Sequence, residues 1–354
     1  MGMLARRRRV VAAGGPAAPT AHQGVTYRDA GVDVAAKTDL LEKLAPAVRQ
    51  TYTPGTAPWG GFAGALTLPG GIGRIALTID GVGTKTILAH RLGRHRVIGA
   101  DIVAHCANDL VAAGASPLCF LDYVALPRLD PVLLSDLMAG MTDACARLGV
   151  PLVAGETAEM PDVYVAGAYD LVGVMAGVVR FDLGRDRVRA GDVIIGLAST
   201  GLHTNGFALA RRVAEGADLD APDPTLGTSP ADALLAPHRC YAPAVLDLLP
   251  TMPIHAVAHI TGGGLPGNII RILPQGLRAR LDRSWPIPPV FTWLQRRGRI
   301  SDGEMRRTFN LGVGMTLLVA AEDAPGVLAS LHRQGQEAWV IGAILKGKRE
   351  VVFR

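Results

Sequence analysis

Short apolar runs alternate along this chain with longer stretches in which apolar positions recur every three to four residues. A short apolar run bounded by glycine or polar residues is typical of a buried strand, and the helical spacing marks one face of a helix. We expect strands at 75–79, 118–125, 152–154, 171–179, 193–197, 254–260 and 313–320. We expect helices at 38–48, 102–113, 130–148 and 207–213. This alternation predicts an α/β or α+β protein.

Capping residues and glycines suggest several element boundaries. Asp101 precedes an apolar helical stretch and Gly114 follows it, so we expect Asp101 to be the N-cap of that helix. Asp130 and Pro131 form a similar start for the helix that runs to residue 148. The segment 53–73 is dense in glycine and proline and is expected to be mostly loop.

The length and one charged segment predict the domain organisation. The chain has 354 residues, about twice the usual domain length, so two domains are expected. The charged segment 180–191 contains Gly184 and is the best candidate for a linker. We therefore predict a disordered basic tail at 1–24, an N-terminal domain at 25–182 and a C-terminal domain at 183–354.

The charge distribution argues against a nucleic-acid-binding protein. The net charge is +5, but residues 1–27 hold four consecutive arginines and no acid, which leaves the remainder close to neutral. No basic stripe interleaved with aromatic residues follows, so no nucleic-acid surface is expected. An organellar targeting segment is the alternative to a disordered tail for residues 1–24.

The cysteines and the lengths of the apolar runs point to the cytoplasm. Cys106, Cys119, Cys145 and Cys240 lie far apart without a C-x-x-C pair, which indicates reduced thiols rather than disulfides or a zinc site. No apolar run reaches the roughly 18 residues that a membrane span needs, so no membrane partner is expected.

Four predicted strands are followed directly by glycine-rich segments that carry an acid, a hydroxyl or a histidine. These segments are 80–85, 155–160, 199–206 and 261–264. Glycine lets backbone N–H groups approach a ligand, and consecutive N–H groups at a helix start attract phosphate. Carboxylates and hydroxyls are ligands that magnesium prefers. Together they suit a nucleotide or phosphorylated substrate bound through a metal.

The hexamer D-G-V-G-T-K at 80–85 is the sharpest of these segments. It is not a Walker loop, because the G-x-x-x-x-G-K-[ST] spacing is absent. Asp80 could bind a metal, the backbone of Gly81 and Gly83 could cradle phosphate, and Lys85 could neutralise it. An ordinary Asp-Gly turn is the alternative interpretation.

The apolar helix after Asp101 contains three polar residues, and each has two readings. Asp101, His105 and Asp109 share one helix face. An acid in so apolar a helix needs a partner, so Asp109 is either a metal ligand or a structural hydrogen-bond acceptor, with the metal favoured. His105 is interpreted first as a core histidine and only second as a ligand. Asn108 stands beside Asp109 on the same helix.

The remaining polar positions at strand ends also leave alternatives open. Glu156 and Glu159 either cap the next helix or bind metal. His203 and His259 stand beside glycines at strand ends and could donate to phosphate or act as acid or base. Taken singly, each histidine is more simply a structural residue.

These segments, in this order, resemble the phosphoribosylformylglycinamidine cyclo-ligase (aminoimidazole ribonucleotide synthetase, PurM) family along nearly the whole chain from Tyr27. The matching motifs are Y-R-D-A-G-V-D (27–33), D-G-V-G-T-K (80–85), N-D-L (108–110), F-L-D-Y (120–123), G-E-T-A-E-M-P (155–161), G-L-H-T-N-G (201–206) and H-I-T-G-G-G (259–264). The stretches P-x-V-F-T-W-L-Q (288–295) and E-M-x-R-T-F-N-x-G-V-G-M (304–315) look specific to this family within its superfamily.

The resemblance implies a fold, a reaction and a partner. The family fold is an N-terminal α+β domain, whose sheet pairs with that of a second subunit into a barrel across a homodimer, followed by a C-terminal α/β domain. The expected reaction uses ATP and Mg²⁺ to phosphorylate the formyl amide oxygen of formylglycinamidine ribonucleotide (FGAM). The substrate's own nitrogen then displaces phosphate and closes the ring, giving 5-aminoimidazole ribonucleotide (AIR), ADP and phosphate.

The resemblance also assigns roles to residues that match the motifs. The implied metal ligands are Asp80, Asp109 and Glu156. The implied ATP-binding residues are Asp29, Gly31, Asp33, Gly81, Gly83, Thr84, Lys85 and Asn108. The implied substrate-binding residues are Asn205, Thr261, Gly262, Gly263 and Gly264. The implied catalytic residues are His203, His259 and Lys85.

Three positions depart from the family pattern, and two other functions remain to be weighed. Ala45 stands where a lysine is common, Asp162 where a glycine is usual, and Gly267 where an acid commonly precedes Asn268. The runner-up function is an ATP-dependent small-molecule kinase of the same superfamily, similar to thiamine-monophosphate kinase. The family-specific stretches at 288–315 argue against it. A catalytically silent binding subunit is disfavoured because the polar residues of the motifs are retained together.

Overall fold

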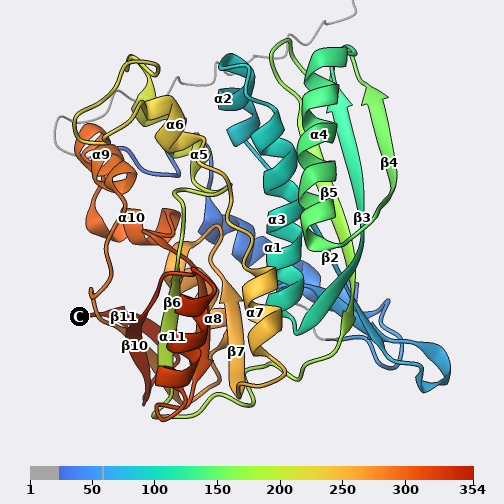
Figure 1. Ribbon diagram of the computed structural model, residues 1–354, viewed down its shortest axis with the longest axis vertical. Coiled ribbons are helices and arrows are strands. Elements are labelled where there is room, and N and C mark those ends of the chain that lie inside the picture. The colour runs from blue at the N-terminus through green and yellow to red at the C-terminus, as the bar shows by residue number, and fades with distance from the viewer. Residues whose placement is uncertain (1–23, 58–59) are drawn as a thin grey trace, which may run out of the picture.

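The computed structural model describes residues 24–57 and 60–354, and its strands form two separate sheets (Figure 1). The predicted basic tail therefore lies almost wholly outside the described residues. Segment 180–192, which contains the predicted linker, connects the last strand of the first sheet to the first strand of the second. Within the described residues, no helix is long and apolar enough to cross a membrane.

The first sheet has five strands in the order β1-β2-β5-β3-β4. Its strands are β1 (Gly64–Thr67), β2 (Arg74–Gly81), β3 (Ala115–Leu126), β4 (Leu152–Glu159) and β5 (Asp170–Val179). All neighbouring pairs are antiparallel except β3 and β4, which are parallel. The apolar run at 75–79 thus correctly predicted β2, whereas β4 continues five residues beyond the predicted strand.

Helices α3 (Arg96–Ala112) and α4 (Pro131–Leu148) lie side by side along one face of this sheet (Figure 1). Their backbones approach so closely that a Cβ on Gly99 would lie 2.1 Å from the carbonyl oxygen of Leu137. Glycine is required there because any side chain would push the helices apart. The predicted start of α4 is confirmed, because the Asp130 side chain accepts hydrogen bonds from two N–H groups of its first turn.

The opposite face of the first sheet carries apolar side chains that remain accessible. Along β2 the side chains alternate, so Ala76 and Thr78 are buried while Leu77 and Ile79 are 41% and 68% exposed. Val174 of β5 is paired with Ile79 and extends the same surface. An accessible apolar surface of this kind marks an interaction site in a soluble protein.

The second sheet has six strands in the order β11-β8-β10-β6-β9-β7 and is antiparallel apart from the β8–β11 pair. Its strands are β6 (Val193–Ala198), β7 (Ile254–His259), β8 (Leu277–Leu281), β9 (Val313–Val319), β10 (Ala338–Lys346) and β11 (Glu350–Phe353). Every residue of β9 is buried, in agreement with its continuous apolar sequence.

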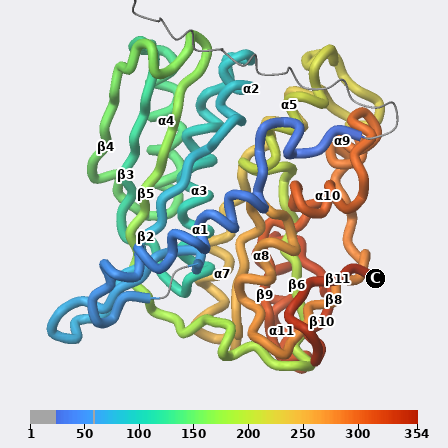
Figure 2. The backbone as a smooth tube through the Cα atoms, turned by 180° about the vertical axis from the view of Figure 1, so that it is seen from behind, coloured from blue at the N-terminus to red at the C-terminus, as the bar shows by residue number. Residues whose placement is uncertain are grey.

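We call the part of the chain that carries the first sheet the first half, and the part that carries the second sheet the second half. The remaining helices surround the second sheet or connect these two halves. They are α1 (Val34–Arg49), α2 (Lys85–Arg91), α5 (Phe207–Ala214), α6 (Pro230–Leu234), α7 (Ala242–Leu248), α8 (Gly264–Ile272), α9 (Pro289–Gly298), α10 (Asp302–Thr308) and α11 (Ala324–Arg333). Seen from behind, α1 crosses from the first half towards α8 (Figure 2). Helix α3 lies between the first sheet and the second half, where it faces β7 and α7 (Figure 1).

Two predicted capping roles are wrong. Helix α3 begins at Arg96 with His95 at its N-cap, so Asp101 lies inside the helix rather than at its start. The apolar residues before Asp101 extend the helix because nothing in 96–100 interrupts it. Glu156 and Glu159 lie within strand β4, so neither caps a helix.

Asp162 adopts a left-handed backbone conformation, with φ of 68°. Only glycine adopts this region without steric cost, although aspartate and asparagine tolerate it better than most residues. This conformation accounts for the glycine that the family pattern usually has at the position.

Candidate active site

Two carboxylates from different elements meet at one histidine where the first sheet faces the second half. Asp80 lies near the end of β2, and His105 and Asp109 lie one turn apart on α3. His105 Nε2 is 2.8 Å from Oδ2 of Asp80 and 3.9 Å from Oδ2 of Asp109. The Asp80 side chain is 40% exposed, whereas that of His105 is 3% exposed. Solvent therefore reaches this cluster from the Asp80 side.

Charge pairing dominates the protonation of this cluster. Burial by itself would raise the pKa of Asp80, but the paired His105 imidazolium lowers that pKa to about 2. Burial would likewise lower the pKa of His105, yet the charge of Asp80 raises it to about 9. At neutral pH a protonated His105 thus stands between two carboxylates and occupies the position of a shared cation.

Asp109 is fixed from both sides by the neighbouring strands. Its Oδ1 lies 2.8 Å from Nδ1 of His259, at the end of β7, and its Oδ2 accepts a hydrogen bond of 3.4 Å from Thr78 Oγ1 on β2. His105 Nδ1 lies 2.9 Å from Oγ1 of Thr204, in the loop after β6. The cluster therefore ties the first sheet to two loops of the second half.

Lys85 and Asp101 form a second, closed pair. Lys85 Nζ donates to Oδ2 of Asp101 at 2.6 Å and to the carbonyl oxygen of Ala236 at 3.0 Å. Both side chains are 0% exposed, and complete burial raises the pKa of Asp101. In the described structure the ammonium group of Lys85 is thus enclosed and already paired, and its contact with ATP phosphates stays a prediction.

Asn108, which is expected to bind the cofactor, is hydrogen-bonded to protein groups in the described structure. Its side-chain amide donates to the carbonyl oxygen of Arg239 at 2.9 Å, and its Oδ1 accepts from the N–H of Tyr241 at 2.7 Å. The residue is 0% exposed. Asn108 thus holds the segment before α7 against α3.

His238, in the segment between α6 and α7, is a polar residue that the sequence patterns missed. Its Nε2 lies 3.1 Å from Nε2 of His259, and its backbone N–H donates to Asp101 at 2.7 Å. The surrounding residues A-P-H-R follow no predicted strand and contain no glycine. No local signal in the sequence therefore pointed to it.

A groove runs between α1 and the start of α8. It consists of two adjoining cavities of about 670 and 810 Å³ that share Gly263 and Gly267. A Cβ on Gly264 would lie 2.1 Å from the carbonyl oxygen of Arg306, so glycine is required where α8 begins. The cations that line the groove are Arg28, Lys37, Arg49, Arg185, Arg271, Arg307 and Arg349, and the acids are Asp33, Asp39, Glu42, Glu304 and Glu350; most of the positive charge lies in the larger cavity. A helix start with these cations around it favours a phosphorylated ligand.

The N-terminal segment covers one end of this groove. The backbone N–H of Tyr27 donates to Oε1 of Glu304 on α10 at 2.8 Å, and Arg212 donates to the carbonyl oxygen of Asp29. Asp33 caps α1 and lines the groove, whereas Gly31 forms a turn with φ of 92°. The segment that carries these predicted nucleotide contacts is therefore docked on the second half.

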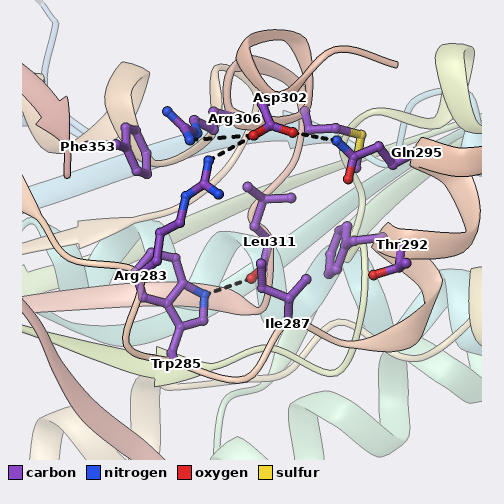
Figure 3. Close-up of a pocket in the computed structure, with 11 residues that line it drawn as sticks. Arg283, Trp285, Ile287, Thr292, Gln295, Asp302, Arg306, Leu311 and Phe353 are labelled. Carbon is purple, nitrogen blue, oxygen red and sulfur yellow. Dashed lines mark hydrogen bonds and ion pairs between the residues drawn. The ribbon is translucent and has the colours of Figure 1, made fainter. Parts of the chain in front are cut away.

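The stretches around 288–315 help to hold the N-terminal segment in place, because they fix helix α10. Figure 3 shows their small cavity of about 160 Å³, where Asp302 on α10 accepts from Arg283 at 2.8 Å and from Gln295 at 2.7 Å. Trp285 Nε1 donates to the carbonyl oxygen of Leu311 at 2.8 Å. These bonds fix α10, which presents Glu304 to the N-terminal segment.

Comparisons with known proteins decide the family. Residues 60–179 match the model described as AIR synthase related protein, N-terminal domain, and residues 189–354 match its C-terminal domain. A relative from Nitrosococcus oceani, named phosphoribosylformylglycinamidine cyclo-ligase, is 45% identical over 92% of this chain and 93% of its own. The chain belongs to the phosphoribosylformylglycinamidine cyclo-ligase family.

A second cyclo-ligase relative agrees with this assignment, and a solved structure shares the fold. The relative from Thermosynechococcus vestitus that bears the same name is also 45% identical, over 92% of this chain and 98% of its own. Among solved structures, thiamine-monophosphate kinase from Stenotrophomonas maltophilia aligns with a TM-score of 0.59 at 20% identity, over 89% of this chain and 95% of its own. At that identity the likeness shows a shared fold and no more.

The cyclo-ligase chain brings some of the expected site residues together and separates others. Asp80 and Asp109 meet at His105, while Glu156 lies exposed on edge strand β4. Strands β5 and β3 lie between β4 and β2, so Glu156 is about 14 Å from Asp80 across the sheet. The described chain therefore does not bring the three predicted metal ligands together.

The expected phosphate and substrate loops of the cyclo-ligase chain take two positions. Gly81, Gly83 and Thr84 lead from β2 into α2, and Gly83 has φ of 68°. The other segment follows β7, where Gly262 and Gly263 line the groove. The remaining predicted residues lie nearby: Thr261 Oγ1 is 3.3 Å from Asn268, and Asn205 stands next to Gly262.

His203 and His259, which are expected to act as substrate-facing acid and base, are buried in the described structure. Their side chains are 1% and 0% exposed, and neither is among the residues that line the groove in the described structure. His259 orients Asp109, whereas His203 stacks on His238 at a centroid distance of 4.1 Å. Both histidines thus contact other residues of the site, whereas glycines and cations line the groove.

Proposed function

We propose that the protein is an ATP- and magnesium-dependent phosphoribosylformylglycinamidine cyclo-ligase that converts FGAM into AIR, ADP and phosphate. The observation that carries the proposal is the meeting of Asp80 and Asp109 at one solvent-reached cluster beside a groove rich in glycine and cations. A metal-nucleotide and a phosphorylated substrate need these two kinds of surface side by side.

The donor set at Asp80 and Asp109 fits magnesium. Mg²⁺ is usually bound by one or two carboxylates, with phosphate oxygens and waters completing the shell. Both carboxylates already share one cationic neighbour, the His105 imidazolium, so the position favours positive charge. When bound there, Mg²⁺ would neutralise the ATP phosphates. Two solved structures of the same fold, titled AaThiL with AMPPCP and TMP and T. maritima PurL with AMPPCP, hold an ATP analogue.

The groove beside α8 suits the phosphate and ribose of the substrate. Gly263 lines the groove at the start of α8, and Arg271 and Arg349 add positive charge. Asn268 fixes this loop, because its side-chain amide donates to the carbonyl oxygen of Gly264 at 2.9 Å. These residues would hold the substrate while the N-terminal segment covers the groove.

Within this frame the chain's own residues position the reactants. Transfer of the γ-phosphoryl group to the formyl oxygen makes that oxygen a leaving group, and the substrate nitrogen then forms the ring bond as phosphate departs. Such chemistry depends on positioning and on charge neutralisation more than on covalent help from the protein. Asp80 and Asp109 supply the carboxylates that would bind the metal ion, and His259 keeps Asp109 in place.

We also propose that the enzyme is a cytoplasmic homodimer whose first sheets pair through their open faces. Leu77, Ile79 and Val174 give this face a continuous apolar surface. Closing two such sheets into a barrel would remove it from water. The second subunit is also the source from which an acid equivalent to Glu156 could approach the Asp80–Asp109 cluster. The four cysteines are free thiols, as a reducing compartment requires.

The small-molecule kinase is the alternative function, and product analysis separates the two. Purified protein is incubated with FGAM, ATP and Mg²⁺ while AIR and ADP are measured together. The proposal expects AIR and ADP in equal amounts and neither without Mg²⁺. ADP with a phosphorylated product but no AIR would instead indicate the kinase, and no ADP at all would indicate a binding protein.

A further inference from the structure

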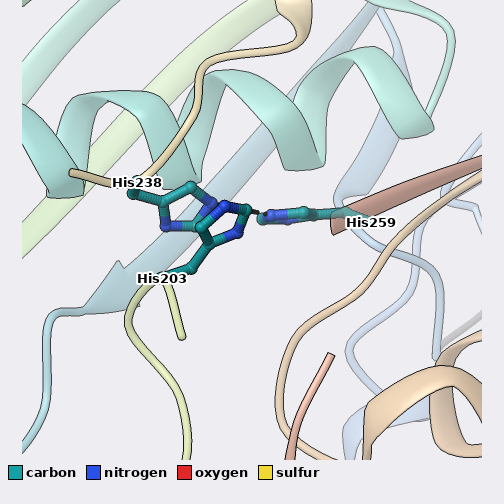
Figure 4. Close-up of side chains that lie close together, drawn as sticks. All are labelled: His203, His238 and His259. Atoms are coloured by element: carbon teal, nitrogen blue, oxygen red, sulfur yellow. Dashed lines mark hydrogen bonds between the residues drawn. The ribbon is translucent and has the colours of Figure 1, made fainter. Parts of the chain in front are cut away.

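Three histidines from three separate segments meet in the interior of the protein (Figure 4). His203 lies in the loop after β6, His238 precedes α7, and His259 ends β7. Each offers a ring nitrogen, and the three nitrogens lie within 4.8 Å of one another. All three residues are buried, with exposures of 1%, 5% and 0%.

His203 has no hydrogen-bond partner within the described structure for either ring nitrogen. A buried polar atom without a partner is costly, so native proteins rarely leave one unexplained. The His203 ring is stacked on His238 with an interplanar angle of 17°. A metal ion that accepts the lone pair of one His203 nitrogen would remove the cost of leaving that nitrogen unpartnered.

His238 and His259 bring two more ring nitrogens together. Asp109 accepts from His259 Nδ1, which leaves the Nε2 of neutral His259 as an acceptor. That atom lies 3.1 Å from Nε2 of His238, and Oγ1 of Thr204 lies 3.4 Å from the other ring nitrogen of His238. Without a metal ion, an N–H of His238 can bridge the two Nε2 atoms. A metal ion between them would replace this bond once the His238 proton moves to Nδ1, which faces Thr204.

The charged groups near these rings are paired with opposite charges. The His105 ring lies 5.2 Å from that of His238 and 5.0 Å from that of His259, centroid to centroid, and its Nε2 faces the carboxylates of Asp80 and Asp109. Lys85 is paired with Asp101. A neutral imidazole is the form that binds metal.

We propose that His203, His238 and His259 form a binding site for one divalent transition-metal ion of the zinc class, separate from the magnesium site. Three imidazoles with an open fourth position are a common zinc donor set, and imidazole favours zinc, cobalt and nickel over magnesium. Zinc–nitrogen bonds of about 2.0–2.1 Å place two ligand nitrogens roughly 3.3 Å apart, close to the 3.1 Å between His238 and His259. The His203 ring turns off its stack to complete the set.

Two further features match a metal centre. The Asp109–His259 contact has the form of the carboxylate–histidine–metal arrangement, in which the carboxylate fixes the ring and increases its basicity. His238 also borders a cavity of about 300 Å³, lined by Arg147 and Cys240 among others, that provides an entry path. A bound ion would connect the loop after β6, the segment before α7 and the end of β7.

Cobalt binding tests the site independently of catalysis. Full-length protein stripped with a chelator is titrated with Co²⁺, and visible absorption reports tetrahedral coordination. We expect one equivalent to bind and a large molar excess of Mg²⁺ to leave the spectrum unchanged. His238→Gln should weaken Co²⁺ binding by at least about 100-fold. His332→Gln is the matched control. His332 lies on α11, and its Nε2 contacts the carbonyl oxygen of Ala338 at the start of β10.

A measurement on the unaltered protein covers the case in which a variant fails to fold. X-ray absorption of the protein loaded with one equivalent of Zn²⁺ should show three nitrogen ligands at about 2.0 Å. The proposal is overturned by equal Co²⁺ affinity in a folded His238→Gln variant and the wild type. It is also overturned by a first shell of oxygens only, which would place the ion at Asp80 and Asp109, or by no binding below millimolar concentration.

Discussion

Asp101 and Asp109 lie on the same face of helix α3, two turns apart, yet their surroundings differ. Asp101 is fully enclosed and faces the ammonium group of Lys85. Asp109 faces His105 and His259 and shares His105 with Asp80, which solvent reaches. An acid whose counter-ion is a fully buried lysine stabilises the fold. An acid that faces histidines near solvent can instead exchange them for a metal ion. The partner and the access, rather than the acid itself, distinguish the two roles.

The largest expected effect is a loss of activity at the open cluster, which consists of Asp80, His105 and Asp109. Asp80→Asn removes one carboxylate from the open cluster, so we expect the rate of ADP release to fall by at least about 10³-fold, since charge stabilisation of the reacting group is lost. The midpoint of thermal unfolding should change little. Asp143→Asn is the control, because Asp143 pairs with Arg96 on the surface. An active Asp80→Asn variant would contradict the assignment of the open cluster.

The closed pair should respond through stability. Lys85→Met leaves Asp101 buried without a counter-ion, so we expect the free energy of unfolding to fall by about 3–5 kcal/mol. Denaturation by urea measures it. Lys85→Met combined with Asp101→Asn should recover most of the loss, because no buried charge remains. A stable but inactive Lys85→Met variant would instead support the original expectation that Lys85 contacts ATP.

A third prediction concerns the apolar face of the first sheet, through which we propose that two subunits pair. Ile79 is adjacent to Asp80 and 68% exposed on the open sheet face. Ile79→Glu should raise the dissociation constant of the dimer by at least about 30-fold, or roughly 2 kcal/mol, since it places a charge in an apolar contact. Sedimentation equilibrium gives this constant. Ile72→Glu is the matched control, because Ile72 is 78% exposed but lies in the connection between β1 and β2, outside both strands. Equal loss in both variants would argue against sheet pairing.

The smallest effect is expected at a position outside both regions. Asp162→Gly relieves a left-handed backbone conformation, so we expect a stabilisation of about 1 kcal/mol or less and unchanged turnover. The urea midpoint and the rate of ADP release measure the two quantities. A loss of turnover would show that the Asp162 loop takes part in the site.

The sequence predicted much of the fold because its signals are local. Apolar runs marked β2 and β5, and Asp130 with Pro131 marked the start of α4. Asp101 was misassigned because a capping residue and an internal acid look alike until the buried partner, Lys85, is known. The partner is 16 residues away, and that contact depends on how α2 packs against α3.

The candidate site was predictable in part for the same reason. Asp80 and Asp109 stand in recognisable motifs, whereas His238 reaches the site only through the packing of the segment before α7. His105 was interpreted as a core histidine, and it is buried, but its role comes from two carboxylates on either side. Contacts between distant segments carry no local signature in a single sequence.

The most direct test of the contrast is nucleotide binding by calorimetry with AMPPCP and Mg²⁺. It compares the wild type, Asp80→Asn, and the double variant that carries Lys85→Met and Asp101→Asn. The account predicts that the double variant binds the nucleotide with an affinity near that of the wild type, while Asp80→Asn loses the magnesium-dependent part. If the double variant loses binding and Asp80→Asn keeps it, the assignment of the two regions is reversed.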